Sequence, residues 1–248
     1  MRPAGSRSGR AFRTRLADDV SAGQAPDRYG AAMRFIDLSH VIRDGMVTYP
    51  GLPGPEIGEH LSWEESWTRY APGTEIRIAR ISMVANTGTY LDTPAHRYRD
   101  GWGIADLPLE LVAAVPGLVV EVPGPAVGPD AFEGLEVSQR AVLFRTGWSR
   151  HWGTDRYGEQ GHPYLSAEAA DALVAARPVL VGIDSVNIDG THTGERPVHS
   201  ALLAAEIPII EHLTGLDELP EEGFEFFAVP QRVEGMGTFP VRAFAILR

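Results

Sequence analysis

The chain contains no cysteine, carries few basic side chains for its size and lacks a long apolar run. The absence of cysteine excludes disulfides, thiolate nucleophiles and cysteine-ligated zinc, and is typical of a cytoplasmic protein. Twenty-two basic against 33 acidic side chains leave a net charge of -11, which repels phosphate backbones and anionic lipids. No run approaches the roughly 20 apolar residues of a membrane span. We therefore expect a cytoplasmic protein that binds neither nucleic acid nor membranes.

The length of 248 residues fits one domain with a single well-buried core. Residues 1–32 are rich in Arg, Gly, Ser and Ala and lack apolar periodicity, so we expect a disordered N-terminal extension there. Residues 33–248 are expected to form a single catalytic domain. The sequence contains no P-loop, GxGxxG loop or serine nucleophile elbow, which leaves other residues to carry its chemistry.

Hydrophobic periodicity predicts alternating strands and helices. Short runs rich in β-branched residues predict buried strands at 118–122, 141–144, 179–183 and 243–247, and near-alternation predicts another strand at 76–84. Ser166 can cap a helix that ends before Pro178, and one face of this helix would carry Ala169, Ala172, Leu173 and Ala176. The order of strand, helix and strand predicts an α/β fold.

The most informative segment runs from Asn86 to His96 and reads Asn-Thr-Gly-Thr-Tyr-Leu-Asp-Thr-Pro-Ala-His. It resembles the signature of the cyclase family, which includes bacterial kynurenine formamidase and isatin hydrolase and reads His-x-Gly-Thr-His-x-Asp-x-Pro-x-His. Asp92 and His96 match this pattern, as do Gly88, Thr89 and Pro94. The two early histidine positions carry Asn86 and Tyr90 instead.

A second block supports the resemblance. In residues 181–220, His199 and Glu211 lie twelve positions apart (211 minus 199), the interval that the family uses. A weaker similarity to the family's opening strand lies at 36–40. The resemblance covers most of the chain from residue 33 to 248, and it implies the swivelling β/β/α fold of this family.

The resemblance also implies a metal site with fewer ligands than usual. In relatives with the full motif, both early histidines, the aspartate, the later histidine and the glutamate hold one or two divalent ions. Asp92, His199 and Glu211 remain here, and one imidazole with two carboxylates is sufficient for one Zn²⁺ or Mn²⁺. Asn86 offers only a weak amide oxygen, and a protonated tyrosine at position 90 is a poor ligand. We expect at most one metal ion, and a metal-free state stays an equal alternative.

His96 matches the catalytic histidine of the family and is expected to act as a general acid or base. Neutral imidazole titrates near pH 6.5, which suits proton transfer at physiological pH. Without a metal, His96 could still activate water while Tyr90 and Asn86 donate hydrogen bonds to a carbonyl oxygen.

Each of these residues also has a purely structural interpretation. The residues Asn-Thr-Gly-Thr are typical of a turn. Asp92, which precedes Thr93 and Pro94, can stabilise a loop through an Asx-type hydrogen bond. His199 alone would more often cap a helix, and Glu211 alone would be a solvated charge. Aromatic residues Trp63, Trp67 and Tyr70 could wall a substrate pocket, or pack in the core or an oligomer interface. The coincidence of two matching blocks favours the functional interpretation.

The sequence therefore predicts a cyclase-family hydrolase that cleaves an amide, lactam or lactone bond of a small cyclic or aromatic metabolite. One alternative is a metal-independent cyclase or dehydratase of natural-product biosynthesis that uses His96 and Tyr90. Another is a catalytically inactive protein that binds a metabolite. The resemblance also implies a homodimer or homotetramer.

Overall fold

The computed structural model describes residues 33–122 and 124–248, so the predictions for residues 1–32 lie outside it. In this part, nine strands form one mixed sheet with the order β1-β13-β11-β5-β7-β9-β10-β4-β12. In that order the strands are Arg34–Asp37, Phe244–Leu247, Glu222–Phe227, Val115–Glu121, Ala141–Arg145, Leu180–Ile183, Ile209–Glu211, Tyr90–Asp92 and Thr238–Pro240. The pairs β5–β7, β7–β9 and β9–β10 are parallel, and the other pairs are antiparallel.

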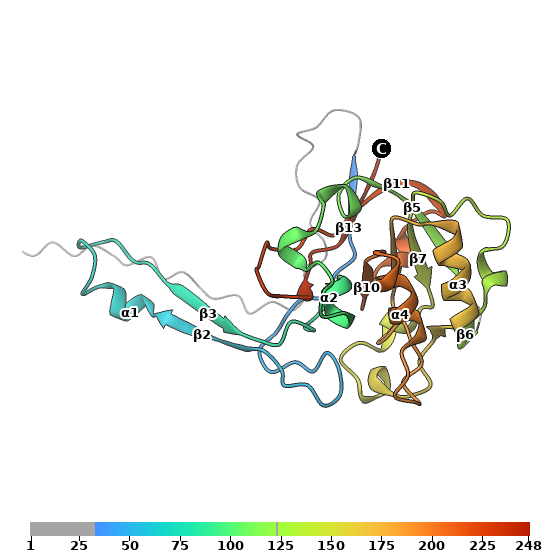
Figure 1. The fold of residues 1–248 in the computed structure, drawn as a ribbon. Coiled ribbons are helices and arrows are strands. Elements are labelled where there is room, and N and C mark those ends of the chain that lie inside the picture. The colour runs from blue at the N-terminus through green and yellow to red at the C-terminus, as the bar shows by residue number, and fades with distance from the viewer. Residues whose placement is uncertain (1–32, 123) are drawn as a thin grey trace, which may run out of the picture. The chain divides into compact units, whose positions relative to one another are not determined.

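Helices α3 (Ala167–Ala176) and α4 (Pro197–Ala204) cover one face of the parallel strands (Figure 1). Alternate strand residues point to that face and join one apolar cluster with α3 and α4, among them Leu118, Val120, Val142, Phe144, Val181 and Ile183. Their neighbours in sequence point to the opposite face and join a second cluster, among them Val119, Ala141, Leu143 and Leu180. This alternation follows from the two-residue period of a strand, and it buries both faces of the sheet.

The predicted helix is confirmed as α3. The Ser166 hydroxyl accepts a hydrogen bond from the Ala169 N–H, which satisfies a free donor of the first turn. The helix ends at Ala176, and the left-handed backbone of the next residue, Arg177 (φ 56°), breaks the helical path before Pro178. The strands predicted from β-branched runs correspond to β5, β7, β9 and β13, of which β13 is only half-buried. The α/β prediction is confirmed.

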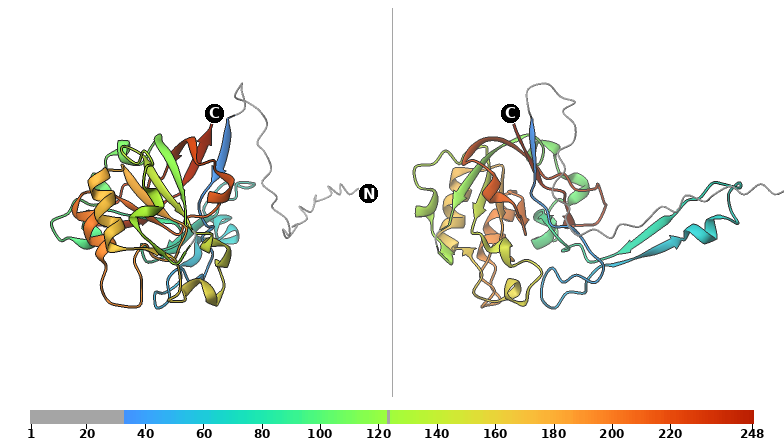
Figure 2. Two further views of the ribbon diagram at one scale, coloured as in Figure 1. Left: turned by 90° about the vertical axis from the view of Figure 1, so that its right-hand side faces the viewer. Right: turned by 180° about the vertical axis from the view of Figure 1, so that it is seen from behind.

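A hairpin arm lies apart from this sheet. Strand β2 (Glu56–Leu61) pairs with β3 (Ile78–Ser82), and helix α1 (Trp63–Ser66) follows β2. The views in Figures 1 and 2 show these elements extending away from the nine-stranded sheet. All five residues of β3 are exposed. The strand predicted at 76–84 is therefore present, but alternation did not mark a buried face.

The remaining elements are short. They comprise the strands β6 (Ala126–Val127) and β8 (Tyr164–Leu165), the helix α2 (Pro94–Arg97), and the 3-10 turns Ile104–Asp106, Leu109–Leu111, Pro129–Phe132, Trp148–His151, Asp155–Gly158 and Leu216–Glu218. Among the residues that the structure describes, no helix has the length and apolar character needed to cross a membrane.

Candidate functional site

Three short strands at one edge of the sheet bring most of the predicted site residues together. Strand β10 places Glu211 opposite Tyr90 of β4, and β12 places Thr238 opposite Asp92 on the other side of β4. Residues directly opposite in antiparallel strands have adjacent side chains, and residues two apart in one strand share a face. Tyr90, Asp92, Glu211 and Thr238 therefore meet on one face of the sheet.

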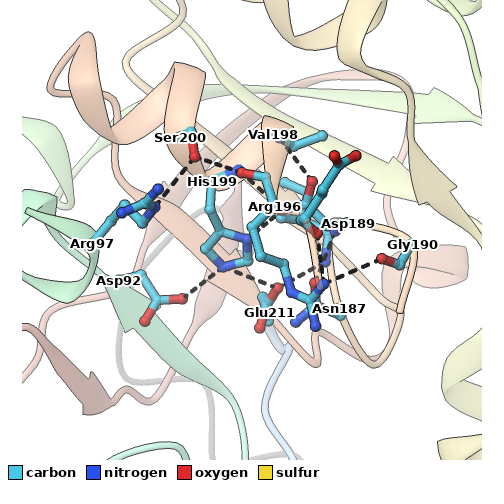
Figure 3. A network of polar contacts seen from close by, with 12 residues as sticks. Asp92, Arg97, Asn187, Asp189, Gly190, Arg196, Val198, His199, Ser200 and Glu211 are labelled. Carbon is cyan, nitrogen blue, oxygen red and sulfur yellow. Dashed lines mark hydrogen bonds and ion pairs between the residues drawn. The ribbon is translucent and has the colours of Figure 1, made fainter. Parts of the chain in front are cut away.

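His199 reaches this face from the first turn of α4 and is oriented by Asp189 (Figure 3). The buried Asp189 carboxylate accepts hydrogen bonds from the backbone N–H groups of Val198 (2.7 Å) and His199 (3.0 Å). It also lies 2.6 Å from the His199 Nδ1 atom. Because Nδ1 is committed to Asp189, Nε2 faces the site, 3.8 Å from Asp92 Oδ2 and 3.6 Å from Glu211 Oε1.

The site holds three buried carboxyl groups around one imidazole. Burial alone would lower the pKa of His199, but hydrogen bonds with Asp189 and Asp92 and the charge of Glu211 raise it to about 10. Burial raises the pKa of Glu211 to about 7, against the opposing charge of His199. The buried acidic groups thus outnumber the buried base, and the site attracts positive charge.

His96 lies on α2 at the rim of the site, with 34% of its side chain exposed. The Thr238 hydroxyl contacts both Asp92 Oδ1, to which it donates, and His96 Nδ1 at 2.6 Å. A hydroxyl has one proton to donate, so with Asp92 as acceptor His96 Nδ1–H donates to Thr238. The lone pair of His96 is then on Nε2, the nitrogen that is free to exchange a proton with a substrate.

Gly237 makes the contact between Thr238 and His96 possible. A Cβ atom at Gly237 would collide with the backbone nitrogen of His96. Only glycine allows β12 to approach α2 this closely. Gly237 therefore has a packing role next to the site.

Tyr90 is 2% exposed, and its hydroxyl donates to Glu211 Oε2 at 2.6 Å. Burial raises the pKa of Tyr90 well above its usual value, as do the charges of Glu211 and Asp92, and only the Asn86 side chain has a small opposite effect. Glu211 Oε1 accepts from the Ile188 backbone N–H at 2.7 Å. Tyr90 is therefore a neutral hydrogen-bond donor to Glu211, and half-buried Asn86 lies beside it.

Behind Tyr90 lies a group of rings in which Tyr157 and His212 are buried and Trp152 and His40 are half-buried. The His212 ring contacts the Tyr90 hydroxyl through Nε2 at 3.2 Å and the Tyr157 hydroxyl through Nδ1 at 2.8 Å. Trp152 packs edge-on against Tyr157 and His212 and stacks on His40, with ring centroids 3.9 Å apart. Burial lowers the pKa of His212 to about 3 and, together with Arg43, that of His40 to about 4.

The donor set fits a single divalent cation. Asp92, His96 and His199 each offer one ligand atom, and these three atoms all lie within 4.8 Å of one another. Asp92 Oδ2 is buried and has no hydrogen-bond partner, an arrangement that is costly unless a cation or a donor satisfies the oxygen. Glu211 Oε1 lies 3.6 Å from His199 Nε2 and so lies next to the same three atoms.

The site thus brings together Tyr90, Asp92, His96, His199 and Glu211, which the sequence singled out, and places Asn86 next to Tyr90. Which of these residues bind metal and which act on a substrate stays a prediction. Sequence reasoning missed Thr238, His212 and Tyr157. No local motif surrounds these three residues, and only the pairing of β12 and the packing behind β4 bring them to the site.

Comparisons with known proteins agree with this architecture. Residues 36–190 match the family model described as "Putative cyclase". A protein named kynurenine formamidase from Salinibacter ruber is 29% identical over 214 residues, which cover 85% of this chain and 96% of the relative. The resemblance noted in the sequence is therefore confirmed at the level of the family, while the replacement of two motif histidines stays a prediction.

Solved structures share the fold. A protein from Bacillus stearothermophilus, described as a predicted metal-dependent hydrolase, has a TM-score of 0.70 and 26% identity, over 88% of this chain and all 100% of that chain. Isatin hydrolase A from Ralstonia solanacearum has a TM-score of 0.74 and 22% identity, over 87% of this chain and 92% of that chain. The expected fold type is confirmed by these matches.

Proposed function

This chain belongs to the cyclase family, and from that premise we propose that it is a hydrolase that uses one divalent metal ion. Its substrate is a small cyclic or aromatic molecule with an amide, lactam or lactone bond. Relatives named kynurenine formamidase and isatin hydrolase support this substrate class. The observation that carries the proposal is the buried, unpartnered Asp92 Oδ2 facing His199 Nε2, because a metal ion would satisfy this oxygen and replace the proton on Nε2.

Asp92, His199 and Glu211 are the proposed ligands of this ion, with His96 at the edge of the same cluster. When bound, a Zn²⁺ or Mn²⁺ ion lowers the pKa of water and polarises a carbonyl oxygen. Asp189 keeps His199 Nε2 directed at the ion, in the way that outer carboxylates commonly orient metal-binding histidines.

His96 moves the proton in this proposal. Its Nε2 accepts a proton from water as the water oxygen bonds to the carbonyl carbon. It then returns that proton to the leaving nitrogen or oxygen as the C–N or C–O bond breaks. Thr238 holds the other nitrogen, so that the ring keeps one orientation through both steps.

The metal-independent alternative assigns carbonyl binding to Tyr90 and Asn86. The buried Tyr90 hydroxyl already donates to Glu211, which favours the metal-dependent reaction. An inactive binding protein would need neither the contact that orients His199 on Asp189 nor the contact between Thr238 and His96. Both contacts therefore favour an enzyme.

Elemental analysis of protein purified without chelator tests the metal. We expect no more than one Zn²⁺ or Mn²⁺ per chain, and two ions per chain would contradict the proposal. If no ion binds even when added, the metal-independent alternative replaces it.

A panel of small amides, lactams and lactones, isatin among them, tests the reaction. On any substrate found, His96→Ala should lower kcat by about 10²- to 10⁴-fold without loss of the fold. Tyr90→Phe then separates the two mechanisms, because losing a main carbonyl donor would cost on the order of 10²- to 10³-fold in kcat. In the metal-dependent reaction this hydroxyl contacts Glu211 and not the carbonyl, so we expect a much smaller fall in kcat when kcat is measured with saturating Zn²⁺.

We also propose that the chain forms a homodimer or homotetramer through the hairpin arm. The arm exposes a row of large apolar side chains, namely Ile57, Trp63, Trp67, Tyr70, Ile78 and Ile81. Exposed apolar area of this kind marks protein interfaces. Light scattering on Trp67→Ser and on Ile81→Asp should give smaller particles than the parent chain, and an unchanged mass would contradict this assignment.

A further inference from the structure

The residues behind Tyr90 form a continuous hydrogen-bond chain that ends on Glu211. Tyr157 contacts His212 Nδ1 (2.8 Å), His212 Nε2 contacts the Tyr90 hydroxyl (3.2 Å), and Tyr90 donates to Glu211 (2.6 Å). Tyr157 is 3% exposed and His212 is 0% exposed, so water does not compete for these contacts. Neither residue lies in the segment 86–96 that carries the motif.

The direction of each hydrogen bond in this series follows from the last one, between Tyr90 and Glu211. The Tyr90 hydroxyl donates its single proton to Glu211 Oε2, so the Tyr90 oxygen must accept from His212 Nε2–H. A neutral imidazole has one N–H, so Nδ1 carries the lone pair and accepts from the Tyr157 hydroxyl. The chain therefore runs one way, from Tyr157 through His212 and Tyr90 to Glu211, and such chains strengthen their members cooperatively.

His212 adopts an unusual backbone conformation that serves these contacts. Its φ of 57° lies in the left-handed region, which a residue other than glycine occupies only when its surroundings enforce it. Its carbonyl accepts a hydrogen bond from Thr89 (2.6 Å). Adjacent strand residues normally point to opposite faces, and this turn lets the His212 ring lie beside Tyr90 on the side of Glu211.

The two oxygens of Glu211 are consequently held for different tasks. Tyr90 occupies Oε2, while Oε1 accepts from the Ile188 N–H and faces His199 Nε2 at 3.6 Å. Oε1 retains a second lone pair, because a carboxylate oxygen accepts two bonds. The side chain is thereby fixed with one oxygen directed into the candidate metal site.

We infer that Tyr157 and His212 are positioning residues, which act through Tyr90 to present Glu211 as a one-oxygen ligand to a divalent cation. This inference rests on the proposed function, because it needs the cation site formed with Asp92 and His199.

The first test uses the unaltered protein and needs no ligand. Nitrogen-15 NMR of the His212 ring should show a protonated Nε2 and a bare Nδ1. A ring with the proton on Nδ1 would reverse the chain and overturn the inference. Tyr90→Phe should change the His212 Nε2–H resonance, and an unchanged resonance would likewise contradict the proposed contact.

The second test measures the affinity for Zn²⁺ by competition with a chelator. Tyr157→Phe should weaken binding roughly 10- to 100-fold, the usual effect of removing a group that orients a metal ligand. His212→Asn should do the same, and asparagine tolerates the left-handed backbone. Tyr98→Phe is the matched control, because its hydroxyl donates to the Ser200 carbonyl outside the chain (2.8 Å).

The outcomes separate this inference from the proposed function. If Zn²⁺ binds and both variants match Tyr98→Phe, the inference is wrong and the metal site stands. If the unaltered protein binds no Zn²⁺, the metal-dependent function and the ligand role of Glu211 are both wrong. The NMR result then shows only whether the one-way chain exists.

Discussion

Replacing His40 by phenylalanine should make the protein more resistant to acid. His40 stacks on Trp152 with the rings 2° from parallel, and its Nε2 atom is buried without a hydrogen-bond partner. Burial, with a smaller effect of Arg43, lowers its pKa from 6.5 to about 4. A phenyl ring preserves the stack and removes the titrating group, so we expect stability near neutral pH to change little.

The direction in which stability changes with pH follows from proton binding by the folded and unfolded states. The unfolded chain takes up a proton near pH 6.5, whereas folded His40 stays neutral until about pH 4. Between these values the unfolded state binds more protons, so stability is present above pH 6.5 and is lost as the pH falls. At about 1.4 kcal/mol per pKa unit, the loss at about pH 4.5 is about 2.5 kcal/mol. This equals a fall in Tm of roughly 5–10 °C for a domain of this size.

Urea denaturation at about pH 7.5 and about pH 4.5 measures this effect. Other groups also titrate in this range, so the informative quantity is the difference between the parent and His40→Phe at each pH. The variant should gain about 2.5 kcal/mol relative to the parent on acidification. His60→Gln, on the exposed strand β2, is the control and should show no such gain. Equal losses in the parent and in His40→Phe would refute the reasoning.

Two further predictions concern the site itself. Thr238→Val should lower kcat on the order of 10²-fold with little change in KM, because the His96 ring loses its orienting contact. Thr238→Ser keeps the hydroxyl and should keep most activity. Equal rates in the two variants would exclude an orienting hydroxyl. Asp189→Asn should lower the pKa of His199 from about 10, which NMR titration measures. It should also weaken Zn²⁺ binding roughly 10- to 100-fold, which chelator competition measures. An unchanged His199 titration would contradict the proposal that Asp189 orients His199.

The sequence predicted what depends on local spacing. Asp92 and His96 lie in one motif and therefore reach the site together on β4 and α2. Helix α3 was predicted with its cap, because Ser166 and Pro178 act on the nearest turn of the chain. The same reasoning predicted a strand at 76–84 but not the exposure of its residues, since periodicity cannot show whether anything packs against the hydrophobic residues.

What the sequence could not predict depends on pairing across long distances. Thr238 reaches His96 only because β12 pairs with β4 in one particular register. His212 follows Glu211 directly, and the two-residue period of a strand would place it on the opposite face. Its left-handed backbone overrides that rule, and no residue type or spacing around position 212 signals such a conformation.

The pairing of β12 with β4 also has a consequence for the order in which the protein becomes active during its synthesis. Thr238 lies 146 positions after Asp92 and 27 positions (238 minus 211) after Glu211, so a ribosome completes the other site segments before it reaches β12. Domains of this kind fold as units, and distant pairs form only after the intervening chain has been released. A nascent chain that has reached Glu211 therefore still lacks the hydroxyl that orients His96. The proposed hydrolysis therefore has to wait until nearly the whole chain has been translated.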